Sequence, residues 1–444
     1  MNYDKIFKAY DIRGIYGEDL NEETAFKIGQ AFGVFLKNKL NKEELKIVLG
    51  KDNRLSSNSL FGFLKRGVMS QGIEVIDIGL STTPLMYFSV AHFDYDGGII
   101  VTSSHNPSKY NGFKFVGPNA QPISENTGLL EIKEMVLNND FKIISTTNKE
   151  EKKSFISEYV SFNSFKEDFK GIKVIVDTAN SVSGILIEDM LKGMDIIHIF
   201  EELNGSFPNH DPDPLKEENI KDLKERVVKE KADLGVAFDG DGDRIFFINE
   251  KGETVSSDLI LALMSSLILK ENPGAKILYD IRSSNIVKET ISEFKGIPVL
   301  SKVGHSLIKE KMRQEDVLFG GEYSGHFFSK NHYFTECPFY VLSTILKEIK
   351  KENKSLSQLI LPFKKYFHSG EINFMAEDKV KTISKFKENY KEGIITEIDG
   401  LRVDFSDWWF LVRASNTEPL IRLIIEAKTQ GLLKEKRIEL TELL

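Results

Sequence analysis

KIVLGKDNRLSS, at residues 46–57, runs an apolar, β-branched segment into an aspartate and a polar turn. The same plan returns in KVIVDTANSVSG (173–184) and KILYDIRSSNIV (276–287), each time with a serine four places after the aspartate. A helical pattern and a second short apolar segment follow every copy. Apolar strand, helix and second strand are typical of parallel sheets covered on both faces. The copies lie a domain's length apart, so they predict three related α/β domains and exclude a solenoid.

The end of the chain follows another pattern. After Leu361-Pro362, four short apolar segments alternate with turns, which favours an antiparallel α+β domain: EINFMAE, GIITEIDGLRVDF, WWFLVRAS and PLIRLIIEAKT. The predicted fold class is α/β, with three topologically similar mixed or parallel α/β domains and a smaller C-terminal α+β domain around a central cleft. The predicted boundaries are 1–150, 151–252, 253–365 and 366–444.

Composition excludes several classes of protein. The 444 residues are 41% hydrophobic and 28% charged, which excludes a disordered or fibrous chain. The net charge of −8 disfavours a general nucleic-acid binder, so a local group of cations must hold any anionic ligand. The longest apolar stretch, residues 259–269, predicts a buried helix because it is too short to span a bilayer. A lone Cys337 and a start without a signal peptide predict a cytoplasmic protein.

The strongest motif is DGDGDR, residues 239–244, between the apolar segments LGVAF and IFFI. Asp239, Asp241 and Asp243 alternate with glycines, which allow the tight curl that would bring three carboxylates to one hard cation. A plain hairpin turn is disfavoured because three like charges repel one another without a cation. An EF-hand is excluded because Arg244 stands where glycine is required and the flanks are strands.

A candidate nucleophile lies in GIIVTSSHNP, residues 98–107. Serine, asparagine and proline are ordinary turn residues, so this loop by itself is more often structural. Ser104 has His105 beside it and Lys114 shortly after, and a hydroxyl becomes a nucleophile when a base or an electrophile is near. A cation on the aspartate loop would supply that electrophile.

Two further loops carry groups suited to a sugar and to a phosphate. In GGEYSGH, residues 320–326, Glu322 and Ser324 suit hydrogen bonding to vicinal sugar hydroxyls. RASNTEP, residues 413–419, offers a guanidinium, hydroxyls and backbone N–H groups to a phosphate. Lys302-Val-Gly-His305 and Tyr10-Asp-Ile-Arg13 are equally open to structural roles. Neither a Walker A sequence nor a GxGxxG after the first strand is present.

Taken together and in this order, the loops resemble the α-D-phosphohexomutase superfamily, most closely its phosphomannomutase/phosphoglucomutase branch. The match runs from FKAYDIRG at 7–14 through TSSHNP, DGDGDR and GEYSGH to RASNTEP. The resemblance implies reversible phosphoryl transfer between C1 and C6 of mannose or glucose phosphate, through a phosphoserine and a hexose 1,6-bisphosphate. It also implies one Mg²⁺ per chain and a phosphosugar as the partner, with neither nucleic acid nor membrane. A monomer and a weak dimer both stay open.

The resemblance further assigns roles to residues. Mg²⁺ would be held by Ser104, as the phosphoserine, with Asp239, Asp241 and Asp243. The catalytic residues would be Ser104, His105, Lys114, Arg244, His305 and His326. The substrate would be bound by Tyr10, Arg13, Lys302, Glu322, Ser324, Arg413, Ser415, Asn416 and Thr417.

Two positions depart from the family pattern, and alternatives stay open. Relatives commonly carry lysine at Arg282, and arginine is a poorer base, so a catalytic role there is in doubt. Tyr323 supports dual use of mannose and glucose only by analogy. One alternative is a phosphoglucosamine mutase of the same superfamily. Another is a haloacid-dehalogenase-type phosphotransferase with Asp239 as nucleophile, which would leave the Ser104 loop unexplained. A catalytically silent phosphosugar-binding protein would need no nucleophile.

Overall fold

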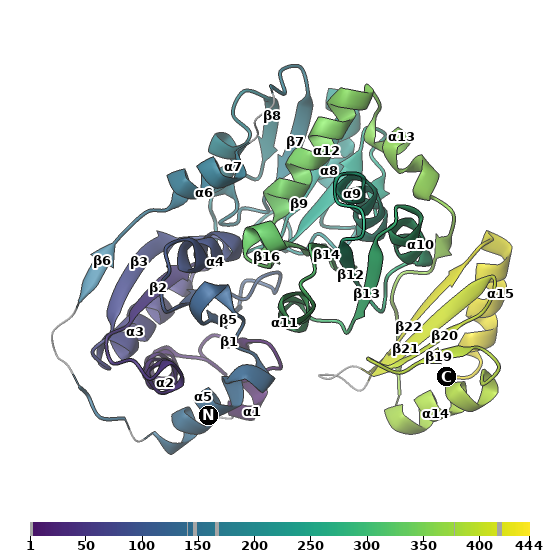
Figure 1. The fold of residues 1–444 in the computed structure, drawn as a ribbon. Coiled ribbons are helices and arrows are strands. Elements are labelled where there is room, and N and C mark those ends of the chain that lie inside the picture. The colour runs from purple at the N-terminus through teal and green to yellow at the C-terminus, as the bar shows by residue number, and fades with distance from the viewer. Residues whose placement is uncertain (1–2, 140, 145–148, 165–167, 377, 415–419) are drawn as a thin grey trace.

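The computed structural model describes residues 3–139, 141–144, 149–164, 168–376, 378–414 and 420–444. It contains four separate sheets, which follow one another in chain order, with the last at one end of the molecule (Figure 1). We name the domains first to fourth after these sheets. Within the described part of the chain, no helix is both long and apolar enough to cross a membrane.

The first domain has a six-stranded sheet in the order β1-β5-β4-β2-β3-β6. Its strands are β1 (Ile12–Ile15), β2 (Lys46–Lys51), β3 (Glu74–Leu80), β4 (Gly97–Val101), β5 (Tyr110–Val116) and β6 (Glu150–Lys152). Its helices are α1 (Tyr3–Ile6), α2 (Glu22–Leu40), α3 (Ser57–Met69), α4 (Thr83–His92) and α5 (Leu129–Asn138), with short 3-10 turns at Pro118–Ala120 and Glu125–Thr127. All residues of α4 from Thr83 to Ala91 are buried, because this helix packs inside the molecule.

The second and third domains have five-stranded sheets in the orders β11-β10-β9-β7-β8 and β13-β12-β14-β15-β16. The second contains α6 (Ile156–Asn163), β7 (Lys173–Asp177), α7 (Gly184–Met190), β8 (Asp195–Ile199), α8 (Lys221–Glu230), β9 (Leu234–Phe238), β10 (Ile245–Asn249) and β11 (Thr254–Val255). The third contains α9 (Ser257–Glu271), β12 (Lys276–Asp280), α10 (Asn285–Glu293), β13 (Ile297–Ser301), α11 (His305–Glu315), β14 (Phe319–Gly321), β15 (Phe327–Ser329), β16 (Thr335–Glu336), α12 (Pro338–Glu352) and α13 (Leu356–Ile360), with 3-10 turns at Lys330–His332 and Leu361–Phe363. The buried helix predicted at 259–269 is α9.

The three repeated segments form equivalent strands. β2, β7 and β12 each lie between two parallel neighbours, and the second neighbour then pairs with an antiparallel strand. The predicted trio of similar α/β domains is therefore confirmed, and the sheets are mixed rather than wholly parallel. The predicted boundaries between the domains stay predictions.

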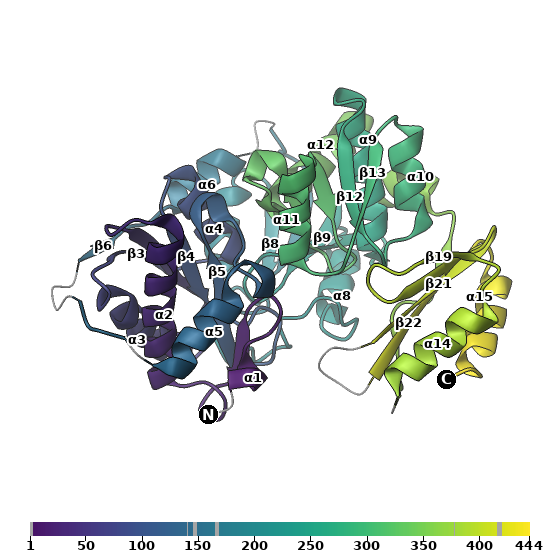
Figure 2. The same cartoon turned by 60° about the horizontal axis from the view of Figure 1, so that its bottom comes forward.

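The fourth domain is a fully antiparallel sheet, as predicted. Its elements are β17 (Phe367–His368), β18 (Ile372–Met375), α14 (Lys379–Asn389), β19 (Ile394–Thr396), β20 (Leu401–Asp404), β21 (Trp408–Ala414), β22 (Leu420–Ala427) and α15 (Gln430–Thr441). Both helices lie on the side of the sheet away from the third domain (Figure 2). Side chains alternate along a strand, so Phe410 of β21 joins the core under these helices while Trp409 and Leu411 pack with Ile281 of the third domain.

Candidate active site

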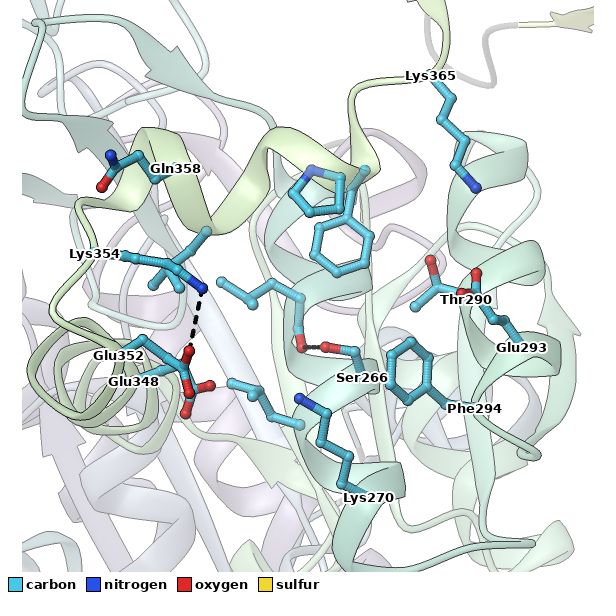
Figure 3. Close-up of a pocket in the computed structure, with 15 residues that line it drawn as sticks. Ser266, Lys270, Thr290, Glu293, Phe294, Glu348, Glu352, Lys354, Gln358 and Lys365 are labelled. Carbon is cyan, nitrogen blue, oxygen red and sulfur yellow. Dashed lines mark hydrogen bonds and ion pairs between the residues drawn. The ribbon is translucent and has the colours of Figure 1, made fainter.

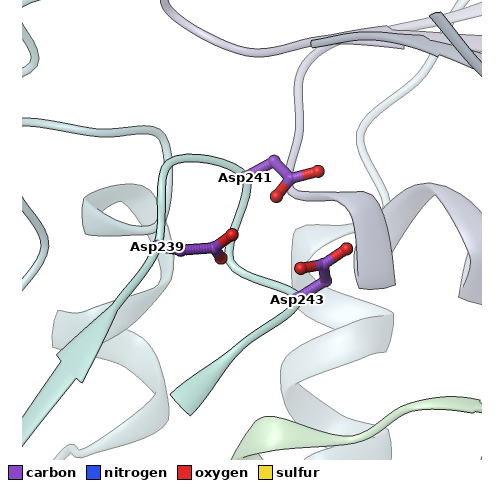
Figure 4. Close-up of side chains that lie close together, drawn as sticks. All are labelled: Asp239, Asp241 and Asp243. Atoms are coloured by element: carbon purple, nitrogen blue, oxygen red, sulfur yellow. The ribbon is translucent and has the colours of Figure 1, made fainter. Parts of the chain in front are cut away.

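The aspartate loop joins β9 to β10 and curls as its glycines allow. Asp239, Asp241 and Asp243 are buried, and one carboxylate oxygen from each lies within 4.8 Å of the others (Figure 4). Gly242 has a φ of +70°, which favours glycine. At Gly240 a Cβ atom would lie 2.3 Å from the carbonyl oxygen of Ser104. Glycine is therefore needed both to bend this loop and to let it approach the loop of Ser104.

Ser104 lies after β4 and connects the first domain to the aspartate loop. Its side chain is buried and its hydroxyl donates to Oδ2 of Asp239 at 2.7 Å. The Nδ1 atom of His105 lies 3.3 Å from the same hydroxyl oxygen. Burial, with the charges of Arg244 and Arg13, holds the pKa of His105 well below its usual value. The hydroxyl thus has an aspartate on one side and a neutral imidazole on the other.

Cations compensate part of the charge of the aspartates. The ammonium of Lys114, on β5, lies 2.6 Å from Oδ2 of both Asp241 and Asp243. Burial alone would lower the pKa of Lys114, but these two carboxylates raise it well above its usual value. Arg244 contributes a weaker contact, with Nε 3.8 Å from Oδ2 of Asp239. The site therefore holds its acidic groups together with cations from two domains.

The donor set fits a divalent metal ion. Oδ1 of Asp241 is buried and has no hydrogen-bond partner among the described residues. Burial and the like charges of Asp243 and Asp241 raise the pKa of Asp239 to about 8, so the nearby cations offset the charge of this carboxylate only in part. Hard carboxylate oxygens are the ligands that Mg²⁺ and Ca²⁺ take in proteins. The buried aspartates can therefore bind a metal.

The sugar loop is the hairpin between β14 and β15, and Glu322 is held there from three sides. Its Oε1 accepts the backbone N–H of Gly304 at 2.9 Å and Nη2 of Arg282 at 3.0 Å, while Oε2 lies 2.9 Å from Nδ1 of His326. Nε2 of His326 lies 3.1 Å from Oδ1 of Asp243. Burial would lower the pKa of His326, but Asp243 and Glu322 raise it to about 9. The imidazolium therefore links the sugar loop to the aspartate loop.

His305, at the start of α11, is buried beside this imidazolium. Its ring stacks on His326 at 5.8 Å between centroids and meets Tyr10 edge-on at 5.9 Å. Within the described chain neither ring nitrogen of His305 has a hydrogen-bond partner. Burial, with the charges of Lys309 and Lys114, holds its pKa well below the usual value. His305 is thus a neutral imidazole free to bond a ligand.

Of the remaining predicted site residues, some lie at the site and others do not. Arg13 bonds Asp11 at 2.7 Å and the side chain of Asn106 at 3.0 Å. It therefore reaches the nucleophile loop, which is the segment 102–109 that carries Ser104 between β4 and β5. The hydroxyl of Ser324 lies 3.1 Å from Nδ1 of His326. Lys302 is exposed. Ser415, Asn416 and Thr417 lie outside the described residues.

Arg413 is the last residue but one of β21 and is held by an aspartate that the sequence did not single out. Its Nη2 lies 3.0 and 3.2 Å from the two carboxylate oxygens of Asp399. Oδ2 of Asp399 also accepts the backbone N–H of Val303 at 2.9 Å, and the carbonyl of Val303 accepts the hydroxyl of Tyr10 at 3.0 Å. Arg422 lies directly across from Arg413 on β22. The fourth domain is thereby joined through the third to the first.

Thr83 is a second site residue that the sequence pattern does not indicate. Its hydroxyl donates to Oδ2 of Asp241 at 2.5 Å, and its N–H donates to the carbonyl of Asp241 at 2.9 Å. The only local signal is the segment STTP at 81–84, which is also typical of an ordinary helix start.

A separate hollow of about 380 Å³ lies in the third domain, lined by α9, α10, α12 and the segment after α13 (Figure 3). Its rim mixes Lys270 and Lys354 with Glu293, Glu348 and Glu352, and Lys354 already pairs with Glu352 at 3.2 Å. None of the predicted site residues lines it. Charges of both signs give it no preference for an anionic sugar phosphate.

Known proteins match along the whole chain. The phosphoglucomutase/phosphomannomutase family models for α/β/α domains I, II and III match residues 4–143, 153–252 and 256–366, and the model for the C-terminal domain matches residues 371–442. The chain therefore belongs to the phosphoglucomutase/phosphomannomutase family, within the α-D-phosphohexomutase superfamily.

Individual relatives agree with the family. A phosphomannomutase of Methanocaldococcus jannaschii is 40% identical, over 99% of this chain and 97% of that protein. A phosphomannomutase/phosphoglucomutase of Pseudomonas aeruginosa is 37% identical, over 96% of this chain and 92% of that protein. The crystal structure of a family member from Burkholderia thailandensis has a TM-score of 0.91 and 31% identity, over 100% of this chain and 98% of that chain. The chain is thus an enzyme of the hexose phosphate mutase type, and the match decides against the haloacid-dehalogenase alternative.

Proposed function

We propose that this enzyme interconverts the 1- and 6-phosphates of mannose and glucose through a phosphoserine at Ser104. The observation that carries the proposal is the 2.7 Å hydrogen bond from the Ser104 hydroxyl to Asp239, which joins the nucleophile loop to the aspartate loop. The loops of Ser104, Asp239 and Glu322 come from three different domains and meet around Lys114 and His326. Such an arrangement serves phosphoryl transfer, which needs mainly positioning and charge compensation.

In the proposed reaction, the bond from phosphorus to Oγ of Ser104 breaks as a bond from phosphorus to a free hydroxyl of the hexose phosphate forms. The product is a hexose 1,6-bisphosphate. It turns end for end, and its other phosphate returns to Ser104, so phosphorus is neither gained nor lost over the cycle. One phosphate clamp at Arg413 serves both orientations.

The sugar hydroxyl must lose a proton in the first transfer. We assign this proton to His305, because its ring is neutral and both nitrogens are free in the described structure. The charged His326 is a poorer acceptor because its pKa is raised to about 9. Glu322, fixed by Arg282 and Gly304, would bond the sugar hydroxyls.

The phosphoserine would add about −1.5 to −2 charges to the aspartates. Mg²⁺, held by Asp239, Asp241, Asp243 and a phosphate oxygen on Ser104, would stabilise the negative charge of the transferring group. Lys114 and Arg244 compensate charge from the protein itself. These positioned cations would then bind the charged ends of the phosphosugar, although the chain as a whole has a net charge of −8.

Phosphorus NMR tests the proposal. Mannose 1-phosphate and glucose 1-phosphate, primed with glucose 1,6-bisphosphate, should both become 6-phosphates. Ser104→Ala should abolish turnover, whereas the matched variant Ser103→Ala should retain it, since Ser103 is the adjacent serine and lies outside the proposed machinery. The enzyme-bound phosphate should survive acid and resist hydroxylamine. Turnover of glucosamine 1-phosphate alone, or an acyl phosphate on Asp239, would contradict the proposal.

A further inference from the structure

Arg54 lies in the turn after β2 and is only 2% exposed. Its guanidinium forms hydrogen bonds with the backbone of the nucleophile loop. It donates to the carbonyls of Ser104 and Asn106, both at 2.6 Å, of Pro107 at 2.8 Å and of Tyr110 at 3.1 Å. A single planar, always charged group therefore sets the path of the loop from Ser104 to Tyr110.

Arg54 is itself fixed from two domains. Oδ2 of Asp52 lies 3.1 Å from its Nε, and Oδ1 of Asp52 accepts its backbone N–H at 3.0 Å. From the second domain, the ring of Phe207 lies 5.0 Å from Cζ, and Gly205 pairs with the Arg54 backbone. A Cβ at Gly205 would lie 2.7 Å from Cα of Arg54. Contacts outside the nucleophile loop therefore fix the position of the guanidinium.

Ser104 needs such support because its φ is +50°, in the left-handed region that disfavours residues with a Cβ. Arg54 bonds the carbonyl of this residue and the carbonyl two residues later, and so fixes the backbone directly after the strained position. This backbone conformation directs the hydroxyl to Asp239. We propose that Arg54, anchored by Asp52, is the positioning residue of the phosphoryl-carrying serine; the inference rests on the proposed role of Ser104.

The repeats support this assignment from within the chain. In the third domain, Arg282 follows Asp280 by two residues, bonds it at 2.9 Å and continues to Glu322 at 3.0 Å. The aspartate–x–arginine unit therefore holds one site loop in the first domain and another in the third.

The second domain has Ala179 at the equivalent place. Its N–H still bonds Asp177 at 2.8 Å, but it has no guanidinium to offer. There the turn instead reaches the aspartate loop through the hydroxyls of Ser181 and Ser183, 3.3 and 3.4 Å from the carbonyl of Asp239. In all three repeats the turn after the central strand supports the site loop of its own domain.

The test compares Arg54→Lys with the matched control Arg66→Lys, an exposed arginine on α3. Lysine keeps the charge but cannot span four carbonyls. We expect Arg54→Lys to lower kcat at least 100-fold with KM changed less than threefold, and to shift or broaden the phosphoserine signal in the phosphorus spectrum. Arg66→Lys should change neither.

Hydrogen exchange separates this inference from the proposed function. In Arg54→Lys, amides of residues 103–110 should exchange at least tenfold faster while the other sheets keep wild-type protection. Unchanged exchange and kcat would overturn the inference. Should Arg54→Lys fail to fold, Asp52→Asn, which keeps the guanidinium, is the second variant, and wild-type kcat in it would overturn the inference. Absence of any phosphoserine from the active wild type would instead refute the proposed function.

Discussion

Lys309 and Glu336 form an ion pair with no exposed side-chain surface, with Nζ 2.9 and 3.2 Å from the two carboxylate oxygens. The pair lies directly behind the candidate active site, since Oε1 of Glu336 is 3.7 Å from Nδ1 of His305. The ammonium also lies 4.3 Å from the centre of the Tyr87 ring, on α4 of the first domain. This pair therefore joins two domains beneath the imidazole assigned as the base.

Removing one partner of this pair should be costly. Lys309→Met leaves the Glu336 carboxylate buried without its counter-charge, which typically costs about 3–5 kcal/mol of unfolding free energy. The double variant Lys309→Met/Glu336→Gln should recover more than half of that loss. Urea unfolding measures both. As a control, Lys330→Met breaks the exposed pair with Asp316 and should cost at most about 1 kcal/mol. Equal losses from the buried and exposed pairs would contradict the prediction.

Metal affinity should depend on Thr83. Its hydroxyl orients Asp241, and loss of such an outer contact typically weakens metal binding about 10- to 100-fold. Thr83→Val should show this in calorimetric titration with Mg²⁺ or Mn²⁺, and Asp241→Asn should bind still more weakly because a charged ligand is lost. Thr344→Val, on α12, removes a partly buried hydroxyl that donates to the carbonyl of Tyr340, and it should leave affinity unchanged. Equal affinity in the two threonine variants would show that Thr83 does not orient the ligand.

The fold could be predicted because its signals are local and repeated. The strands around Asp52, Asp177 and Asp280 are apolar and continuous, and each is followed by a helix pattern. The alternation of aspartate and glycine in residues 239–243 likewise predicts converging carboxylates, and the structure brings those oxygens within 4.8 Å. In each case the residues that determine the local structure are close together in the sequence, so the structure can be predicted from them.

The contacts between domains could not be predicted in this way. Thr83 and Asp241 are 158 positions apart, and Tyr10 and Val303 are 293 apart, so no periodic pattern connects them. Arg282 illustrates the same limit. From the sequence alone, a catalytic role for Arg282 as a base is in doubt. In the structure its guanidinium donates hydrogen bonds to Asp280 and Glu322. Its role is set by the partners that the fold brings to it.

Substrate affinity should depend on Asp399. This carboxylate orients Arg413, the proposed phosphate clamp, and connects it to the third domain through Val303. Asp399→Asn keeps an acceptor for Val303 but loses the charge that holds the guanidinium. We expect KM for mannose 1-phosphate to rise about tenfold with a smaller change in kcat, as for a lost charge-assisted contact. Asp407→Asn, in an exposed pair with Lys428, is the matched control. A fall in kcat without a rise in KM would contradict this role.

Asp258, buried at the start of α9, should make stability depend on pH. Burial, with the charges of Asp280 and Glu426, raises the pKa of its carboxyl to about 7. The pKa of an aspartate in the unfolded chain is about 3.9, so the folded state binds more protons than the unfolded state between these two pKa values. The contribution of Asp258 to the free energy of unfolding therefore falls as pH rises from about 4 to about 7. Asp258→Asn removes it. The Tm of the variant relative to wild type should therefore increase from about pH 5 to about pH 7 and then level off. Asp195→Asn, exposed on β8, should show no such trend, and a difference independent of pH at Asp258 would contradict the prediction.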